Sequence, residues 1–237
     1  YLSVGAPSSA GAEPAPQPGE SISHEDDGLT IVTVGDSLTH GMGDDTGNGY
    51  VGVVKQQLEK TAEQPVYMIP FAVNGYRSDQ LLADLQKEEG IIAAVRKADL
   101  ILMSIGANDF FNVQKELSIS AAKEVLPKAL SRIERIFARL TELNTDAQIV
   151  YIGLYHPFAD FDPAGEAAMF IQQFNQEVFR LTLNVPQIMI VPTFDLFYRT
   201  SDQFLASDHF HPNEEGYARI AERVIQVIEV GEVGDEA

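Results

Sequence analysis

Side chains that support hydrolytic chemistry follow apolar segments at widely separated places in the chain. Ser37 lies in TVGDSLTHGMG (33–43), directly after a short apolar run. Asn108 follows another such run, in GAND, while Asp208 and His211 stand three residues apart in SDHFHPN. A serine hydroxyl can attack a carbonyl carbon when an imidazole takes its proton and a carboxylate orients that imidazole. An asparagine amide can donate a hydrogen bond to the oxyanion that forms. Each residue also has an ordinary use, since Asn108 could form a turn and Asp208 with His211 could belong to a solvated loop, but as a set they favour nucleophilic catalysis.

The segments that must position these residues alternate between two patterns. Near-continuous apolar runs predict five strands, at 29–34, 66–73, 100–105, 148–154 and 187–192. Helical periodicity predicts helices at 50–62, 78–98, 121–143, 166–183 and 213–230. Ser78 is the expected N-cap of the second helix, which we expect to break near Gly90. Apolar strands that alternate with helices predict an α/β fold of three layers, α/β/α, around a five-stranded parallel sheet. The connections should be right-handed crossovers.

The loops after the strands are where we expect the chemistry, because open parallel sheets bind ligands beyond the carboxyl ends of their strands. Ser37 follows the first strand, Asn108 the third, and Asp208 with His211 the fifth. Gly75 follows the second strand, and a glycine lets a backbone N–H face a ligand with no Cβ in the way. All five residues should therefore converge on one edge of the sheet.

Three commoner motifs do not fit the segment around Ser37. The nucleophile elbow G-x-S-x-G needs a glycine where this chain has Thr39. A phosphate-binding loop would end in Gly-Lys-Ser/Thr, which is absent. A calcium loop that begins at Asp44 would place Lys55 where a bidentate glutamate belongs.

The motifs together resemble those of the SGNH hydrolases, also called the GDSL lipases and esterases. GDSLTHG is similar to the first block of that family, GAND to its third, and DHFHPN to its fifth. The second block departs from the family pattern, since Pro70 stands where an asparagine is usual, but Gly75 falls at the position of the family's oxyanion glycine. The resemblance spans about residues 29 to 230 and implies a flavodoxin-like SGNH hydrolase fold.

The resemblance also implies a role for each matched residue. Ser37 would be the nucleophile, His211 the general base and Asp208 the carboxylate that orients His211. The Ser37 N–H, the Gly75 N–H and the Asn108 amide would form the oxyanion hole, and neither a metal nor an organic cofactor would be needed. We favour His211 over His209 as the base because it follows Asp208 by three residues and precedes a proline, as in the family block.

The remaining polar residues of these loops are expected to be structural. His40 and His156 lie in other strand-end loops, where a packed or solvent-facing histidine is the expectation. Asp36 and Asp109 flank the key residues, and we expect both carboxylates to bond loop backbone.

Substrate and reaction remain open at this point. Phe110 follows GAND together with Phe111, and Phe158 lies in the fourth loop; these rings could line an acyl pocket, or pack in the core. The expected partner is a small-molecule acyl ester or a lipid, cleaved as by a lipase, esterase, lysophospholipase or thioesterase. The alternatives are an acetyl esterase that acts on glycans, a metal-dependent phosphoesterase and a non-catalytic ligand-binding domain. The phosphoesterase would draw on Asp36, Asn108, Asp208, His209 and His211 as ligands.

Composition limits the partners and the domain organisation. A formal charge of −19 would repel nucleic acid, and a chain with no cysteine forms no disulfide. Residues 1–27 are rich in Pro, Ala, Ser and Gly and contain no Lys or Arg, which predicts a flexible linker or tail before a single catalytic domain at 28–237. Such linkers often tether an exported domain, so we expect export, with a membrane or cell-wall tether N-terminal to residue 1. A plain disordered tail and a cytoplasmic location are the alternatives.

Overall fold

The computed structural model describes residues 28–62, 64–111, 118–157, 162, 165–198 and 201–235 of the 237-residue chain. The linker predicted at 1–27 and the pocket residue predicted at Phe158 lie outside these ranges.

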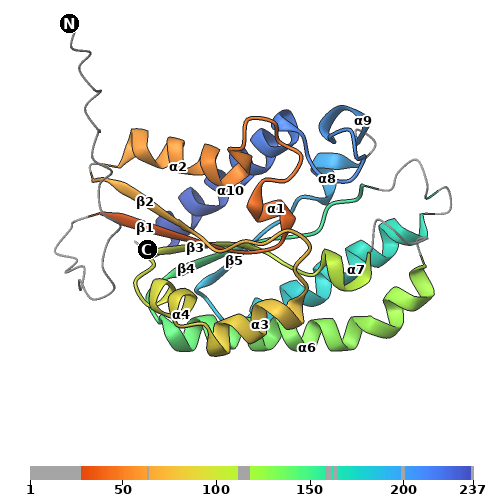
Figure 1. Ribbon diagram of the computed structural model, residues 1–237, viewed down its shortest axis with the longest axis horizontal. Helices are drawn as coiled ribbons and strands as arrows, with labels where there is room; N and C mark the ends of the chain where they lie inside the picture. The colour runs from red at the N-terminus through yellow and green to blue at the C-terminus, as the bar shows by residue number, and fades with distance from the viewer. Residues whose placement is uncertain are drawn as a thin grey trace, which may run out of the picture.

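The centre of the fold is a parallel sheet of five strands (Figure 1). The strands are β1 (Leu29–Gly35), β2 (Val66–Pro70), β3 (Leu100–Ser104), β4 (Gln148–Ile152) and β5 (Ile188–Val191). Their order is β2-β1-β3-β4-β5, with every neighbouring pair parallel. This is the strand order of flavodoxin-like folds, and it confirms the fold class predicted from the sequence.

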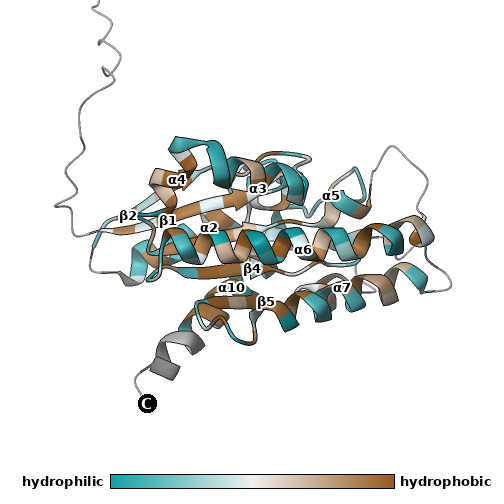
Figure 2. Cartoon of the chain, turned by 90° about the horizontal axis from the view of Figure 1, so that it is seen from below, coloured by the Kyte–Doolittle hydropathy of each residue, from teal (hydrophilic) through white to brown (hydrophobic). Residues whose placement is uncertain are grey.

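Helices cover both faces of the sheet. One face carries α2 (Gly49–Thr61) and α10 (Glu214–Asp235), which contact each other (Figure 1). The other carries α3 (Ser78–Lys87), α4 (Glu89–Val95), α6 (Ile119–Leu143) and α7 (Glu166–Thr182), with α6 between α3 and α7 (Figure 2). Side chains alternate along each strand, so Ile31 packs in the α2/α10 core while its neighbour Val32 packs in the opposite one. Burial on both faces explains the near-continuous apolar runs.

The helix expected at 78–98 is two helices, α3 and α4, which are separated at Glu88, close to the break expected near Gly90. The N-cap predicted at Ser78 was wrong. Ser78 is the first residue of α3, and the N-cap position belongs to Arg77. The Ser78 side chain is engaged elsewhere, because its hydroxyl and its backbone N–H both donate to the Asp109 carboxylate, at 2.7 and 2.9 Å.

In the part of the chain that the structure describes, four one-turn helices lie in the loops beyond the strands. They are α1 (Ser37–His40), α5 (Ala107–Phe110), α8 (Phe194–Phe197) and α9 (Ser201–Phe204). The sequence reading did not predict them, because one turn is too short to display a period of 3.6 residues. Within the described ranges, none of the helices has the length and apolar character needed to cross a membrane.

The strand order reverses between β1 and β3, and this point of the sheet edge is where flavodoxin-like folds bind ligands. Ser37 follows β1 and Asn108 lies two residues beyond Gly106, after β3. The topology therefore places the two predicted residues on either side of the reversal.

Candidate active site

Ser37 begins the one-turn helix α1 at the end of β1. Gly35 makes this turn possible, because it has a φ of +119° and an added Cβ would lie 1.9 Å from the Ser104 carbonyl oxygen. The Asp36 N–H donates to that oxygen at 3.0 Å. The Asp36 carboxylate accepts from the Leu38 N–H at 3.1 Å and from the Ser104 hydroxyl at 2.6 Å, so it is structural as the sequence predicted. Burial raises the pKa of Asp36, and these two hydrogen bonds oppose the rise.

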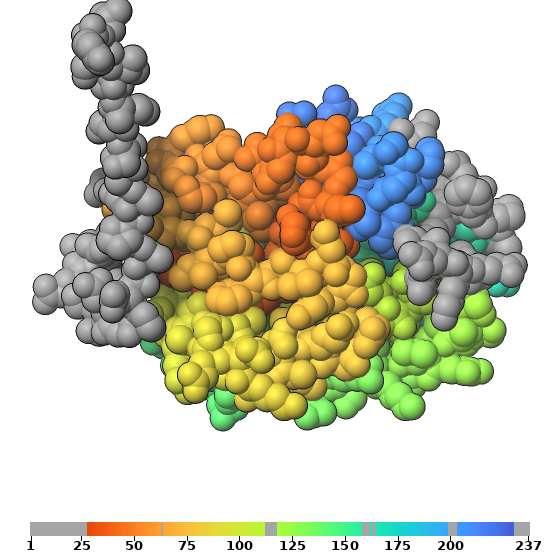
Figure 3. Space-filling model, viewed as in Figure 1, coloured from red at the N-terminus to blue at the C-terminus, as the bar shows by residue number. Residues whose placement is uncertain are grey.

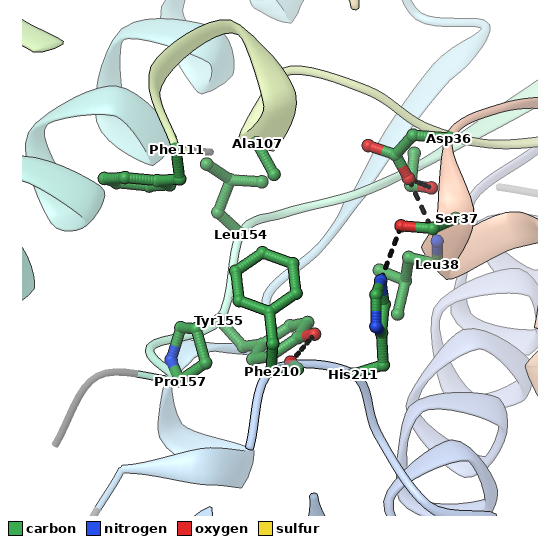
Figure 4. A pocket seen from close by; sticks show the side chains of 11 residues that line it. Asp36, Ser37, Leu38, Ala107, Phe111, Leu154, Tyr155, Pro157, Phe210 and His211 are labelled. Atoms are coloured by element: carbon green, nitrogen blue, oxygen red, sulfur yellow. Dashed lines mark hydrogen bonds between the residues drawn. The ribbon is translucent and has the colours of Figure 1, made fainter. Parts of the chain in front are cut away.

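Asp208, His211 and Ser37 form one hydrogen-bonded chain. His211 Nδ1 lies 2.6 Å from Asp208 Oδ2. His211 Nε2 lies 2.9 Å from Ser37 Oγ, the contact drawn as a dashed line in Figure 4. With Nδ1 facing a carboxylate, the proton of a neutral ring belongs on Nδ1, and Nε2 is left to accept from the serine hydroxyl. Partial burial works against ionisation of Asp208, but hydrogen bonds from the His211 ring and from the Phe210 and His211 N–H groups prevail and lower its pKa.

The segment after α1 lies directly against the loop that carries His211. Figure 3 shows the orange surface around α1 meeting the blue surface of the segment before α10. At Gly43 the backbone has a φ of +93°, and an added Cβ would lie 2.8 Å from the His211 Cβ and 2.7 Å from the Pro212 oxygen. The Tyr217 hydroxyl also donates to the Met42 carbonyl at 2.7 Å. These contacts fix the distance between the Ser37 and His211 loops.

The other histidines make their contacts elsewhere. His209 is exposed, with a φ of +54°, and its N–H donates to the Ala206 carbonyl at 3.0 Å. His40 is exposed at the end of α1. His156 is buried, stacks on Phe194 with a centroid distance of 5.9 Å, and lies 3.5 Å from Asp162. Among the histidines of the described residues, His211 is the one placed against Ser37.

The predicted oxyanion donors Gly75 and Asn108 lie on two segments that are joined to each other. The Asn108 amide donates to the Tyr76 carbonyl at 2.9 Å, which leaves its second N–H for another acceptor. Gly75 has a φ of +77° and faces open space, since nothing lies within 4 Å of an added Cβ. Asp109 is structural, as predicted, but it bonds the first N–H of α3 and not loop backbone: it accepts from the Ser78 N–H and also pairs with Arg132 at 3.3 Å.

An apolar pocket opens beside Ser37 and His211 (Figure 4). Its lining residues are Asp36, Ser37, Leu38, Ser104, Ala107, Phe111, Leu154, Tyr155, Pro157, Phe210 and His211. Phe110, which the sequence suggested for this role, instead packs edge-on against Phe170 and Phe174, with centroid distances of 5.0 and 5.2 Å. Phe111 follows the last residue of α5 in an extended conformation, and its side chain lines the pocket.

Several lining residues were not singled out from the sequence. Leu154, Tyr155 and Pro157 follow β4, and Phe210 lies between Asp208 and His211. Their position in the fourth and fifth strand-end loops is a signal that could have found them. Their side-chain types are common in cores and carry no signal of their own.

The ligand set of a metal-dependent phosphoesterase does not assemble among the described residues. No group of three or more His, Asp or Glu side chains there is arranged to hold a metal ion. Asp36 is bonded to Leu38 and Ser104, while Asp208 and His211 are bonded to each other.

Comparison with known proteins is consistent with this geometry. The uncharacterized protein YpmR of Bacillus subtilis (strain 168) is 33% identical over 208 residues, which are 84% of this chain and 81% of that protein. The spore germination lipase LipC of Bacillus licheniformis is 27% identical over 205 residues, 83% and 94% of the two chains. The crystal structure of the lipase Lip_vut3 from a goat rumen metagenome is 26% identical, covers 84% of this chain and 97% of that one, and superimposes with a TM-score of 0.75.

A family model assigns most of the folded part of the chain. The model of the GDSL-like lipase/acylhydrolase family matches residues 33–219, a range that contains Ser37, Gly75, Asn108, Asp208 and His211. The chain therefore belongs to the GDSL-like lipase/acylhydrolase family.

Proposed function

We propose that this protein is a serine hydrolase that cleaves carboxylic esters through an acyl-enzyme on Ser37. The observation that carries the proposal is the hydrogen-bonded chain from Asp208 through His211 to the Ser37 hydroxyl, with heavy-atom distances of 2.6 and 2.9 Å. Membership of a family of lipases and acylhydrolases supports it.

The geometry supports the following sequence of steps. Ser37 Oγ attacks the ester carbonyl carbon while its proton passes to His211 Nε2. Asp208 holds the ring and stabilises the imidazolium. The oxyanion accepts hydrogen bonds from the Ser37 N–H, the Gly75 N–H and the Asn108 amide. His211 then protonates the departing alcohol, and a water molecule that it activates releases the acid from Ser37.

The apolar lining beside Ser37 favours an ester with a hydrocarbon acyl chain. The apolar side chains of the lining can bury an acyl chain, although they offer it no hydrogen bond. They are Phe111, Leu154, Pro157 and Phe210. Burial of each methylene contributes about 0.8 kcal/mol. An acyl chain longer than acetyl should therefore bind better than acetyl, which distinguishes an acyl-ester hydrolase from an acetyl esterase that acts on glycans.

The test is a chain-length series of nitrophenyl esters, from acetyl upward, with wild type and Ser37→Ala. We expect kcat/KM to rise from acetyl to a longer optimum, and Ser37→Ala to lose almost all turnover. Stoichiometric labelling by a fluorophosphonate, absent from Ser37→Ala, should identify the nucleophile. Equal rates for the two proteins would refute the acyl-enzyme, and an optimum at acetyl with activity on acetylated glycans would favour the acetyl esterase.

A further inference from the structure

We propose that Ser104 is a positioning residue for the nucleophile: its side chain holds the turn that presents both the Ser37 hydroxyl and the Ser37 N–H. This inference rests on the proposed function, and it assigns a role to a residue outside the sequence motifs of the site. Ser104 is the last residue of β3 and lies opposite Gly35 of β1 in the sheet register. It is only 2% exposed.

The Ser104 hydroxyl uses its whole hydrogen-bonding capacity on the segment around Ser37. It donates to Asp36 Oδ1 at 2.6 Å and accepts from the Thr39 N–H at 3.1 Å. It also lies 2.7 Å from Thr39 Oγ1. A hydroxyl has one proton and two lone pairs, and since the proton goes to the carboxylate, Thr39 Oγ1 must be the donor in the third bond. These bonds hold the chain on both sides of Ser37, at Asp36 before it and at Thr39 after it.

The same bonds engage two of the backbone N–H groups in the first turn of α1. The Leu38 N–H is taken by Asp36 at 3.1 Å and the Thr39 N–H by Ser104 at 3.1 Å. For the Ser37 N–H, no acceptor is found among the described residues. That is the amide which the mechanism uses in the oxyanion hole. By engaging the two following amides, Asp36 and Ser104 fix the direction in which the Ser37 N–H points.

A buried tyrosine anchors the network to a second element. Thr39 Oγ1 donates to Ser104, so it accepts from the Tyr50 hydroxyl of α2 at 2.8 Å. Burial raises the pKa of Tyr50 far above its usual value, so this hydroxyl keeps its proton. The hydrogen bonds thus run in one direction, from Tyr50 to Thr39, then to Ser104 and to Asp36. Each of the four residues is at most 2% exposed. The turn is held from β3 and α2 together, by groups that do not contact the reacting atoms.

The test compares Ser104→Ala with a variant that loses a buried hydroxyl outside this network. Thr193→Val is the matched control: Thr193 is fully buried, and its hydroxyl donates to the Gly153 carbonyl at 2.7 Å. The measurements are kcat and KM on one neutral nitrophenyl ester, the rate constant for labelling by a fluorophosphonate, and the thermal midpoint. Since a misplacement of about 1 Å can cost a factor of about 100, we expect Ser104→Ala to lower kcat and the labelling rate by about 10- to 100-fold, with little change in KM.

Further variants separate a positioning role from a loss of folding. Ser104→Thr keeps the hydroxyl and should recover most of the lost kcat, while Thr193→Val should keep the wild-type kcat even if its thermal midpoint falls. If Ser104→Ala does not fold, Thr39→Val removes one side-chain bond to Ser104 and should still lower kcat several-fold. A folded Ser104→Ala or Thr39→Val with wild-type kcat and labelling rate would overturn the inference. Wild-type turnover in Ser37→Ala would instead refute the proposed function, and the inference with it.

Discussion

The Asn108 amide donates one N–H to the Tyr76 carbonyl, and in the proposed mechanism its other N–H donates to the oxyanion. We expect Asn108→Ala and Asn108→Asp to lower kcat alike, by about 10²- to 10³-fold, which is the usual cost of losing one oxyanion donor. The carboxylate of the Asp variant has no proton to donate and would repel the oxyanion. Steady-state kinetics on a neutral ester would measure the loss.

The control for Asn108→Asp is Asn48→Asp, which makes the same change of charge at an exposed position before α2. A negative charge suits a helix N-terminus, so this variant should keep its activity. If Asn108→Asp retained most of its turnover, the oxyanion role of Asn108 would be wrong.

His156 should make stability depend on pH. Burial lowers the pKa of His156, and nearby Asp162 opposes this shift. The unfolded chain therefore takes up a proton near pH 6.5 that the folded chain refuses, so stability falls as pH decreases below that value, by at most about 1.4 kcal/mol per pH unit. We expect His156→Phe, which keeps an aromatic ring beside Phe194, to show a shallower slope in denaturant unfolding between pH 7 and pH 5.5. Identical slopes for the two proteins would show that His156 does not contribute.

Individual site residues could be predicted from the sequence where a reactive side-chain type stands in a loop directly after a predicted strand. Ser37, Asp208 and His211 belong to this class, and the structure joins them in one hydrogen-bonded chain. Ser104 and Phe210 do not, because a serine at a strand end or a phenylalanine in a loop has many ordinary uses. Their roles arise from three-dimensional contacts that no local pattern encodes.

Among the elements, the segment between α1 and α2 lies between Ser37 and the loop that carries His211. An alanine at Gly43 would push its Cβ against the His211 Cβ and the Pro212 oxygen, at 2.8 and 2.7 Å. We expect Gly43→Ala to displace His211 from Ser37 and to lower kcat by about 10- to 100-fold. Kinetics on a neutral ester and the thermal midpoint should be measured together.

Gly47→Ala is the matched control for that effect. Gly47 also has a positive φ, of +73°, but nothing lies within 4 Å of an added Cβ. Both variants should lose about 1–2 kcal/mol of stability from backbone strain, and only Gly43→Ala should lose activity. Equal activities in the two variants would mean that the contact with the His211 loop does not position the base.

The longer elements were predictable because their apolar patterns reflect burial. All five strands and the helices α2, α6, α7 and α10 lie where the periodicity placed them, within a few residues at their ends. The strand expected at 66–73 ends at Pro70, yet the Phe71 and Val73 N–H groups still donate to β1 carbonyls, at 2.8 and 2.9 Å. That continuation lies within the range predicted as strand, and it leads the chain toward Gly75.

At the scale of the whole molecule, the formal charge of −19 should act on substrates before they bind. Acidic side chains also lie in the loops of the candidate site, among them Asp36, Asp109 and Asp208. A negative potential lowers the encounter rate with anions, and salt screens it, since the Debye length falls from about 30 Å at 0.01 M to about 8 Å at 0.15 M. Ester substrates of different charge should therefore respond differently to salt.

We expect a neutral nitrophenyl ester to keep its kcat/KM between these two salt concentrations, within about a factor of two, because it has no net charge to be steered. An analogue with the same acyl chain and a sulfonate on the leaving group should be cleaved several-fold faster at the higher concentration. Since the acyl chain and the chemistry on Ser37 are unchanged, the difference between the two esters isolates the long-range field. A faster reaction of the sulfonated ester at low salt would mean that local cations outweigh the net charge at the entrance.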